Sequence, residues 1–175
     1  HNCLVGSEMC IRDRMSTLSL KEFSNDSFFV GETPAKQKVI FGEGISSSVG
    51  HHASLLGNHA LLVSDKGIQA AGHVEKVQRI IEDSGTKVTV YVESIENPTE
   101  SSVAKCVAVA KKSKIDLIIG LGGGSSMDTA KGCNFLLTNG GKMEDFWGVG
   151  KAKFPLLPLI AIPTTAGTGS ECQSF

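Results

Sequence analysis

The 175-residue chain has almost no net charge and no long apolar run. Its 17 Lys and Arg residues nearly balance its 18 Asp and Glu residues, and no basic stretch interleaves with aromatic side chains. Nucleic acids and anionic membrane surfaces are therefore poor partners, because both select clustered positive charge. A membrane helix requires about 18–20 consecutive apolar residues, and no run in the chain approaches that length.

Recognisable metal and redox motifs are also missing. The cysteines are Cys3, Cys10, Cys106, Cys133 and Cys172. Their number is odd and no two have C-x-x-C spacing, which favours a reduced, cytoplasmic protein. The histidines are His1, His51, His52, His59 and His73. No two have the i, i+4 spacing that places imidazoles on one helix face, so we predict no metal ligand. A G-x-S-x-G nucleophile motif is absent as well, and we predict no catalytic residue in the chain.

The chain divides into three segments by composition. Residues 1–14 lack the apolar core of a signal peptide and show no period, and we interpret them as a non-native or disordered leader that ends before Met15. Residues 15–37 form an N-terminal extension. Residues 38–175 carry regular patterns and constitute the predicted folded domain.

Strand and helix patterns alternate along residues 38–175. Short, β-branched or apolar runs predict strands at Lys38–Gly44, His59–Asp65, Lys87–Ser94, Asp116–Leu121 and Leu157–Thr165. Apolar positions at steps of three and four, often with a glycine stop, predict helices at Ser46–Gly57, Ile68–Gly85, Asn97–Ser113 and Ser125–Gly141. Such alternation predicts an α/β fold, with crossover helices covering both faces of a parallel sheet.

Three consecutive glycines, Gly122–Gly124, separate a predicted buried strand from a predicted helix. A helix N-terminus offers unpaired N–H groups and a partial positive charge, and both stabilise a phosphate. Glycine would let the backbone approach such a ligand closely, and we expect Ser125 and Ser126 to cap the helix and donate to an oxygen. The alternative is a tight strand-to-helix turn that binds nothing.

Two common phosphate-binding motifs do not explain this loop. A P-loop requires Gly-Lys-Ser/Thr, but here Lys131 precedes Gly132. The dinucleotide fingerprint G-x-G-x-x-G, counted from Gly120, has Ser125 at its third glycine position. Its acidic residue should end a strand about 20 residues further on, and the acids at that distance, 144 and 145, follow a predicted helix instead.

Asp65 is better placed to recognise a ribose, because it directly ends the strand "ALLVS". A carboxylate at this position could accept both hydroxyls of an adenosine ribose, and its charge would repel a 2′-phosphate, which favours NAD over NADP. The alternative, which position alone favours, is an ordinary turn or N-cap Asp before Lys66 and Gly67.

A second polar loop, "PTTAGTGSE" at Pro163–Glu171, also follows a predicted strand. Thr164, Thr165 and Thr168 offer hydrogen-bond donors for a phosphate or a carboxamide. Two such loops at the ends of two strands make a shared ligand the better interpretation.

The segments "GGGSSMDTAK" and "FPLLPLIAIPTTAGTGSE" resemble the iron-containing (group III) alcohol dehydrogenases. The segments "VIFGEG", "ALLVSDKG" and "ENPTESSV" match the pattern of the same family, so the resemblance runs from Lys38 to Phe175. Glycerol dehydrogenases and dehydroquinate synthases share related motifs.

The resemblance implies a Rossmann-like dinucleotide-binding domain followed by an all-helical metal domain. It implies that the glycine–serine motif contacts the pyrophosphate, that Asp65 reads the adenosine ribose, and that Asp128 lies near the nicotinamide. It also implies that the threonine loop lines the cofactor. The cofactor-binding residues implied in this way are Asp65, Gly122, Gly123, Gly124, Ser125, Asp128, Thr164, Thr165 and Thr168.

The family's metal ligands would follow Phe175, so we expect a chain cut before the metal-binding domain. The resemblance implies an intact parent that uses NAD, with NADP second, and iron or zinc to transfer hydride between the nicotinamide and a small alcohol, aldehyde or ketone. It also implies a homo-oligomer, and we expect the fragment alone to be inactive. The alternatives are a non-catalytic nucleotide-binding module and a relative of dehydroquinate synthase or glycerol dehydrogenase.

Overall fold

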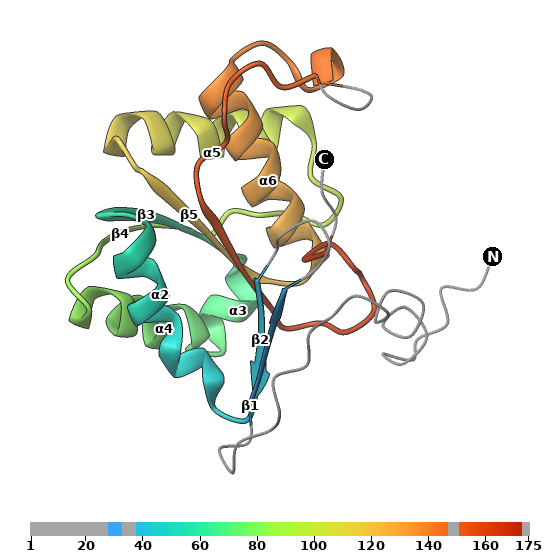
Figure 1. Ribbon diagram of the computed structural model, residues 1–175. Coiled ribbons are helices and arrows are strands. Elements are labelled where there is room, and N and C mark those ends of the chain that lie inside the picture. The colour runs from blue at the N-terminus through green and yellow to red at the C-terminus, as the bar shows by residue number, and fades with distance from the viewer. Residues whose placement is uncertain (1–27, 33–37, 147–150, 173–175) are drawn as a thin grey trace. The chain divides into compact units, whose positions relative to one another are not determined.

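The computed structural model describes residues 28–32, 38–146 and 151–172 (Figure 1). The chain forms two compact units, residues 1–47 and residues 48–175. Trp147 and the leader at residues 1–14 lie outside the described residues.

The first unit contains an antiparallel pair of strands, β1 (Phe28–Glu32) and β2 (Lys38–Gly42). A short 3₁₀ helix, η2 (Ile45–Ser48), follows them. Strand β2 was predicted from its β-branched pattern. Strand β1 was not, because its five residues show no alternation and it acquires its hydrogen-bond partners only by pairing with β2.

The second unit is built on a four-stranded parallel sheet with the order β4-β3-β5-β6, which confirms the predicted fold class. The strands are β3 (His59–Val63), β4 (Lys87–Tyr91), β5 (Leu117–Gly122) and β6 (Leu159–Pro163). In register, Val63 lies opposite Tyr91 on one side and Gly120 on the other. Gly122 lies opposite Pro163, so the carboxyl ends of all four strands meet at one edge.

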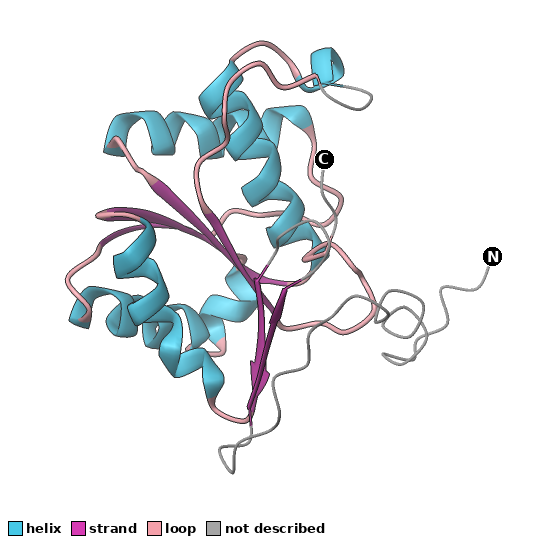
Figure 2. Cartoon of the chain, viewed as in Figure 1, coloured by secondary structure: helices cyan, strands magenta, loops and turns pink. Residues whose placement is uncertain are grey.

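Helices cover both faces of this sheet (Figures 1 and 2). They are α2 (Val49–Leu56), α3 (Lys66–Ala70), α4 (His73–Asp83), α5 (Glu100–Ser113) and α6 (Gly124–Asn139). A short 3₁₀ helix, η3 (Met143–Phe146), follows α6. Leu61 and Val63 of β3 pack in one buried cluster with residues of α5 and α6. Ala60 and Leu62 pack in a second cluster with α2 and α4, so alternate side chains of one strand supply the two cores.

The single helix predicted for Ile68–Gly85 is wrong, because the chain forms two helices there. Gly72 has a left-handed φ of 77° and separates α3 from α4. This conformation is accessible to glycine at little cost and interrupts the helical backbone. The predicted apolar stripe remains in α4, where Val74, Val77 and Ile81 are buried.

Close packing holds α6 against β5. All six residues of β5 are buried. A Cβ added at Gly120 would lie 3.1 Å from Met127 Sδ and 3.3 Å from Ala130 Cβ. Gly120 therefore lets the helix approach the strand, which fixes where the N-terminus of α6 begins.

At the opposite edge of the sheet, Asp116 ties the beginning of β5 to the beginning of β3. Its Oδ1 accepts hydrogen bonds from the backbone N–H groups of Asn58 at 2.9 Å and His59 at 2.8 Å. Burial acts to raise the pKa of Asp116, but the hydrogen bonds from Asn58 and His59 outweigh it and hold the pKa below its usual value.

Candidate functional site

The candidate site lies at the topological switch point of the sheet. From β3 the chain crosses to β4 on one side and then returns to β5 on the other side of β3. Loops that leave β3 and β5 therefore diverge at their carboxyl ends, where open α/β sheets bind ligands. Asp65 follows β3 and Gly123 follows β5, so the structure brings two separate predicted site positions to this edge of the sheet.

The N-terminus of α6 has no side-chain cap. Its N-cap is Gly123, and the first intrahelical bond is donated by Met127 N to Gly123 O at 3.2 Å. The amides of Gly124, Ser125 and Ser126 precede that bond, which is the arrangement that binds anions at helix N-termini. The expectation that Ser125 and Ser126 cap the helix is wrong, because the helix begins at Gly124 and places both serines within its first turn.

Ser126 instead contacts Asp65. Its buried hydroxyl donates to Asp65 Oδ2 at 3.1 Å. Asp65 is also the N-cap of α3, because its Oδ1 accepts from Gly67 N at 2.9 Å and Ile68 N at 3.0 Å. The N-cap alternative is therefore confirmed, and the half-buried carboxylate joins the β3–α3 loop to the start of α6.

The three glycines of this loop lie close to neighbouring protein atoms. Gly122 has a φ of 142°, and a Cβ there would lie 2.6 Å from Ser126 Oγ and 3.1 Å from Asp65 Oδ2. A Cβ on Gly123 would lie 3.2 Å from Thr165 Oγ1. These positions therefore keep room for three converging loops, a reason that sequence spacing alone does not reveal.

The threonine loop lies against the glycine loop. Thr164 N donates to Gly122 O at 2.9 Å, which continues the β5–β6 pairing past the end of the strands. A Cβ on Gly124 would lie 3.3 Å from Thr168 Cβ. Thr164, Thr165 and Thr168 are exposed. The structure thus brings the two predicted loops together and leaves the threonine side chains accessible.

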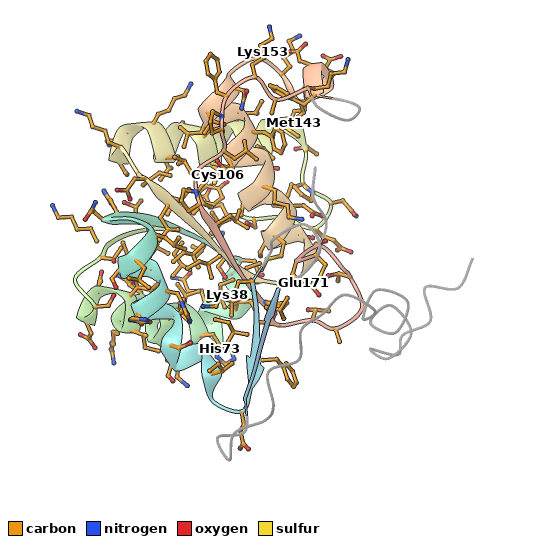
Figure 3. The ribbon with its side chains drawn as sticks, in the orientation of Figure 1. Lys38, His73, Cys106, Met143, Lys153 and Glu171 are labelled. Carbon is orange, nitrogen blue, oxygen red and sulfur yellow. The ribbon has the colours of Figure 1, made fainter. Side chains whose placement is uncertain are left out.

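Asp128 lies one turn further along α6, close to a buried lysine that the sequence analysis did not single out as a site residue. Lys131 Nζ donates to the carbonyl oxygen of Ser170. The residue after Ser170 is Glu171, which is labelled in Figure 3. Burial lowers the pKa of Lys131, and the charges of Asp128 and Glu171 oppose that lowering. Lys131 follows Asp128 by three residues, so helical spacing was the available signal for this pair.

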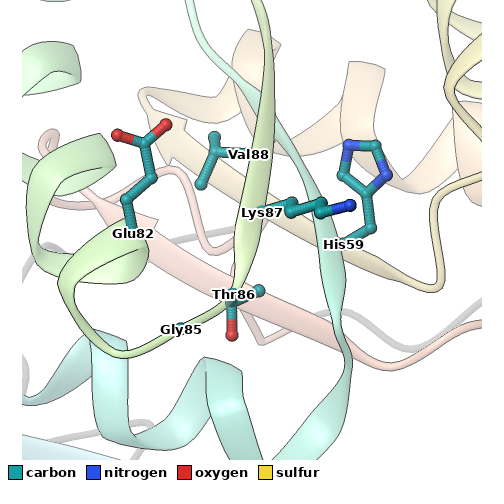
Figure 4. A pocket seen from close by; sticks show the side chains of 6 residues that line it. All are labelled: His59, Glu82, Gly85, Thr86, Lys87 and Val88. Atoms are coloured by element: carbon teal, nitrogen blue, oxygen red, sulfur yellow. The ribbon is translucent and has the colours of Figure 1, made fainter.

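A pocket lies away from the candidate site. It is lined by His59, Glu82, Gly85, Thr86, Lys87 and Val88 (Figure 4). His59 and Lys87 are the first residues of β3 and β4, so the pocket opens at the amino edge of the sheet. Since the glycine loop follows the carboxyl end of β5, we place the candidate site there rather than in this pocket.

Within the described residues, no group of three or more His, Cys, Asp and Glu side chains could hold a metal ion. His51 and His52 lie on α2 with ring centroids 5.4 Å apart, whereas His59 is on β3 and His73 begins α4. The described side chains therefore do not fit the metal that the resemblance implies. None of the described helices is both long and apolar enough to cross a membrane.

Comparisons with known proteins show which enzymes the chain is similar to. The chain is 40% identical over 137 residues to alcohol dehydrogenase 4 of Schizosaccharomyces pombe, which covers 78% of the chain and 32% of the relative. A crystal structure of 1,3-propanediol oxidoreductase superposes with a TM-score of 0.72 at 36% identity, over 75% of the chain and 35% of that protein. Sulfoacetaldehyde reductase from Bifidobacterium kashiwanohense, solved in complex with NAD⁺, gives a TM-score of 0.64 at 32% identity, over 75% and 35% of the two chains.

The chain spans about a third of the length of these relatives. They are oxidoreductases by name and give no support to a non-catalytic module or a dehydroquinate synthase. Residues 36–175 match the family described as iron-containing alcohol dehydrogenase. On this match, and on the parallel sheet that it shares with the solved structures, the chain belongs to the iron-containing alcohol dehydrogenase family.

Proposed function

We propose that this chain is the cofactor-binding half of an NAD-dependent alcohol dehydrogenase. The parent enzyme would transfer hydride between nicotinamide C4 and the carbinol carbon of a small alcohol, or in reverse onto an aldehyde or ketone. The observation that carries the proposal is the N-terminus of α6, which has no side-chain cap and lies at the switch point beside Asp65. A dinucleotide supplies both a diphosphate for the amides and a ribose for the carboxylate.

Each predicted site residue has a role in this proposal. The cofactor pyrophosphate would lie on the amides of the glycine loop, Gly122–Gly124, and of Ser125. The adenosine ribose would donate to Asp65, whose charge would disfavour the 2′-phosphate of NADP. From the pyrophosphate the nicotinamide half would extend toward β6, where Thr164, Thr165 and Thr168 are exposed. Asp128 would lie near the nicotinamide, as the resemblance implies.

The chain's own contribution to the reaction is to bind and orient the nicotinamide ring. A divalent metal, iron or zinc, would supply Lewis-acid polarisation of the substrate oxygen when bound. The chain spans about a third of the length of its relatives, and we propose that the remaining part of a longer parent would hold this metal. The substrate is therefore proposed only as a small alcohol, aldehyde or ketone.

Titration of the purified chain with NADH and NADPH, followed by nicotinamide fluorescence, tests the proposal. We expect saturable NADH binding, weaker NADPH binding and no oxidation of alcohol without added metal. No fluorescence change at millimolar NADH would contradict the binding role. Oxidation of alcohol by the chain without a metal would contradict the proposal that the chain binds the cofactor and the metal polarises the substrate.

We propose that the parent is a cytoplasmic homo-oligomer. Of the described cysteines, Cys106 and Cys133 are free and buried and Cys172 is free and exposed, which suits a reducing compartment. Cell fractionation and light scattering of the parent protein would test the two statements. Recovery in an oxidising compartment, or a monomer at micromolar concentration, would contradict them.

A further inference from the structure

The carboxylate of Asp65 is already largely engaged by the protein. Oδ1 accepts two hydrogen bonds, from Gly67 N and Ile68 N, and Oδ2 accepts one, from Ser126 Oγ. An ionised carboxylate has about four acceptor positions, two on each oxygen. One position on Oδ2 therefore remains for a ligand. The sequence-based expectation that Asp65 accepts both ribose hydroxyls exceeds this capacity.

The hydrogen bond from Ser126 Oγ to Asp65 Oδ2 lies where the β3–α3 loop meets the start of α6. Ser126 is only 1% exposed, and it lies 61 residues after Asp65 in the chain. Gly122 passes directly beside the pair, and a Cβ on it would lie 2.6 Å from Ser126 Oγ. The hydroxyl of Ser126 and the two amides at the start of α3 thus hold the carboxylate from both of its oxygens.

We propose that Ser126 is a positioning residue that orients Asp65 and sets its discrimination between NAD and NADP. This inference rests on the proposed function. The Ser126 hydroxyl directs the remaining acceptor of Oδ2 at one ribose hydroxyl. It also prevents the carboxylate from rotating away from the 2′-phosphate of NADP, so that the two negative charges continue to repel each other.

A purely structural tether makes different predictions. If Ser126 only joined α6 to the β3–α3 loop, its removal would weaken NADH and NADPH binding equally. It would do so whether or not Asp65 were present. A positioning role changes the ratio of the two affinities, and only while the carboxylate is there to be oriented.

The test is a double-mutant cycle on the whole chain with Ser126→Ala, Asp65→Ala and the double variant, titrated with NADH and NADPH. For Ser126→Ala we expect the Kd for NADH to rise about threefold to tenfold, as for the loss of a hydrogen bond to a charged group, and the Kd for NADPH not to rise. In the Asp65→Ala background, Ser126→Ala should leave both Kd values unchanged.

Ser102→Ala is the matched control. Ser102 is the third residue of α5, as Ser126 is of α6, and its buried hydroxyl also makes a hydrogen bond. This variant should lose stability and keep the NADH-to-NADPH ratio. Ser126→Cys, a near-isosteric change to a weaker donor, provides a second variant if the alanine variant does not fold, and it should shift the ratio in the same direction.

Equal losses for both cofactors, or the same loss in the Asp65→Ala background, would overturn the positioning role while leaving the proposed function intact. No NADH binding by the unmodified chain would overturn the proposed function, and this inference with it. Melting temperatures of every variant separate unfolding from a change in binding.

Discussion

Helices α5 and α6 both have a serine as their third residue, Ser102 and Ser126, but the two serine hydroxyls have different partners. In α5, Ser102 Oγ accepts from Thr99 N at 2.9 Å, and Thr99 Oγ1 accepts from Ser102 N at 3.3 Å, which is a reciprocal capping box. In α6 the N-cap is Gly123, no side chain caps it, and the hydroxyl of Ser126 turns to Asp65. Side chains therefore cap the N-terminus of α5, whereas no side chain caps the N-terminus of α6, where we propose that the cofactor binds.

This difference indicates how the protein can omit a stabilising cap. A side-chain cap contributes about 1 kcal/mol to a helix. Helix α6 compensates through burial, since nine of its residues are buried and Gly120 lets it lie close to β5. Tertiary packing thus holds α6 in place while its N-terminus remains available for binding.

The largest expected effect comes from giving α6 the cap that it lacks. Gly123 has φ −80° and ψ −171°, a conformation that any residue adopts. An added Cβ would lie 3.2 Å from the hydroxyl of the exposed Thr165, which can shift by a few tenths of an ångström, so Gly123→Asp should fold. Its carboxylate would occupy the amides and repel a diphosphate. We expect the Kd for NADH to rise about 100-fold, equivalent to one or two charge-assisted hydrogen bonds.

Fluorescence titration measures this effect, and Gly123→Ser separates capping from charge, since it adds a neutral cap and should weaken binding less. An NADH affinity equal to that of the unmodified chain in the Asp variant would show that α6 does not bind the diphosphate.

The second largest effect concerns Gly122, which precedes α6 and has a positive φ. Gly122→Ala should destabilise the chain by about 2 kcal/mol, because alanine is strained at φ 142° and its Cβ would meet Ser126 Oγ. Urea unfolding gives the value, with Gly140→Ala as a control for positive φ without a nearby atom. If the two variants lost the same stability, the contact with Ser126 would contribute nothing.

Removing the cap of α5 should have a smaller effect on stability and should not affect cofactor binding. Thr99→Ala removes the capping box and is expected to cost about 1 kcal/mol of folding stability. Urea unfolding measures the loss, and an NADH titration should return the affinity of the unmodified chain. A weaker NADH affinity at full folding would mean that the β4–α5 loop also contacts the cofactor.

The smallest effect concerns the amino edge of the sheet and depends on pH. Because the pKa of Asp116 is lowered in the folded chain, its hydrogen bonds stabilise the fold above the unfolded pKa of about 3.9. That contribution is lost as the pH falls through the folded pKa. Asp116→Asn should therefore cost less than about 1 kcal/mol at pH 6, and the difference should disappear toward pH 2. Urea unfolding from pH 6 to pH 2 checks this, and a difference independent of pH would exclude the carboxylate charge as its cause.

Local patterns were sufficient to predict most of the second unit. The apolar runs at His59–Asp65 and Asp116–Leu121 correspond to β3 and β5. A strand that helices cover on both faces is a short continuous apolar run, and such a run can be recognised in the sequence by itself. The glycine loop was also predicted at a strand-to-helix junction. The split at Gly72 was missed, because a glycine inside an amphipathic pattern does not reveal its φ.

The chain's alternating apolar runs and glycine stops therefore determined by themselves the α/β class, the parallel sheet and the positions of its two polar loops. Only the tertiary structure decided that Ser126 binds Asp65 rather than capping its own helix, and that Lys131 lies near Asp128 and Ser170. The physical reason is distance along the chain. Periodicity reports contacts within a few residues, whereas the contact between Ser126 and Asp65 forms only when β3 and β5 pair in register.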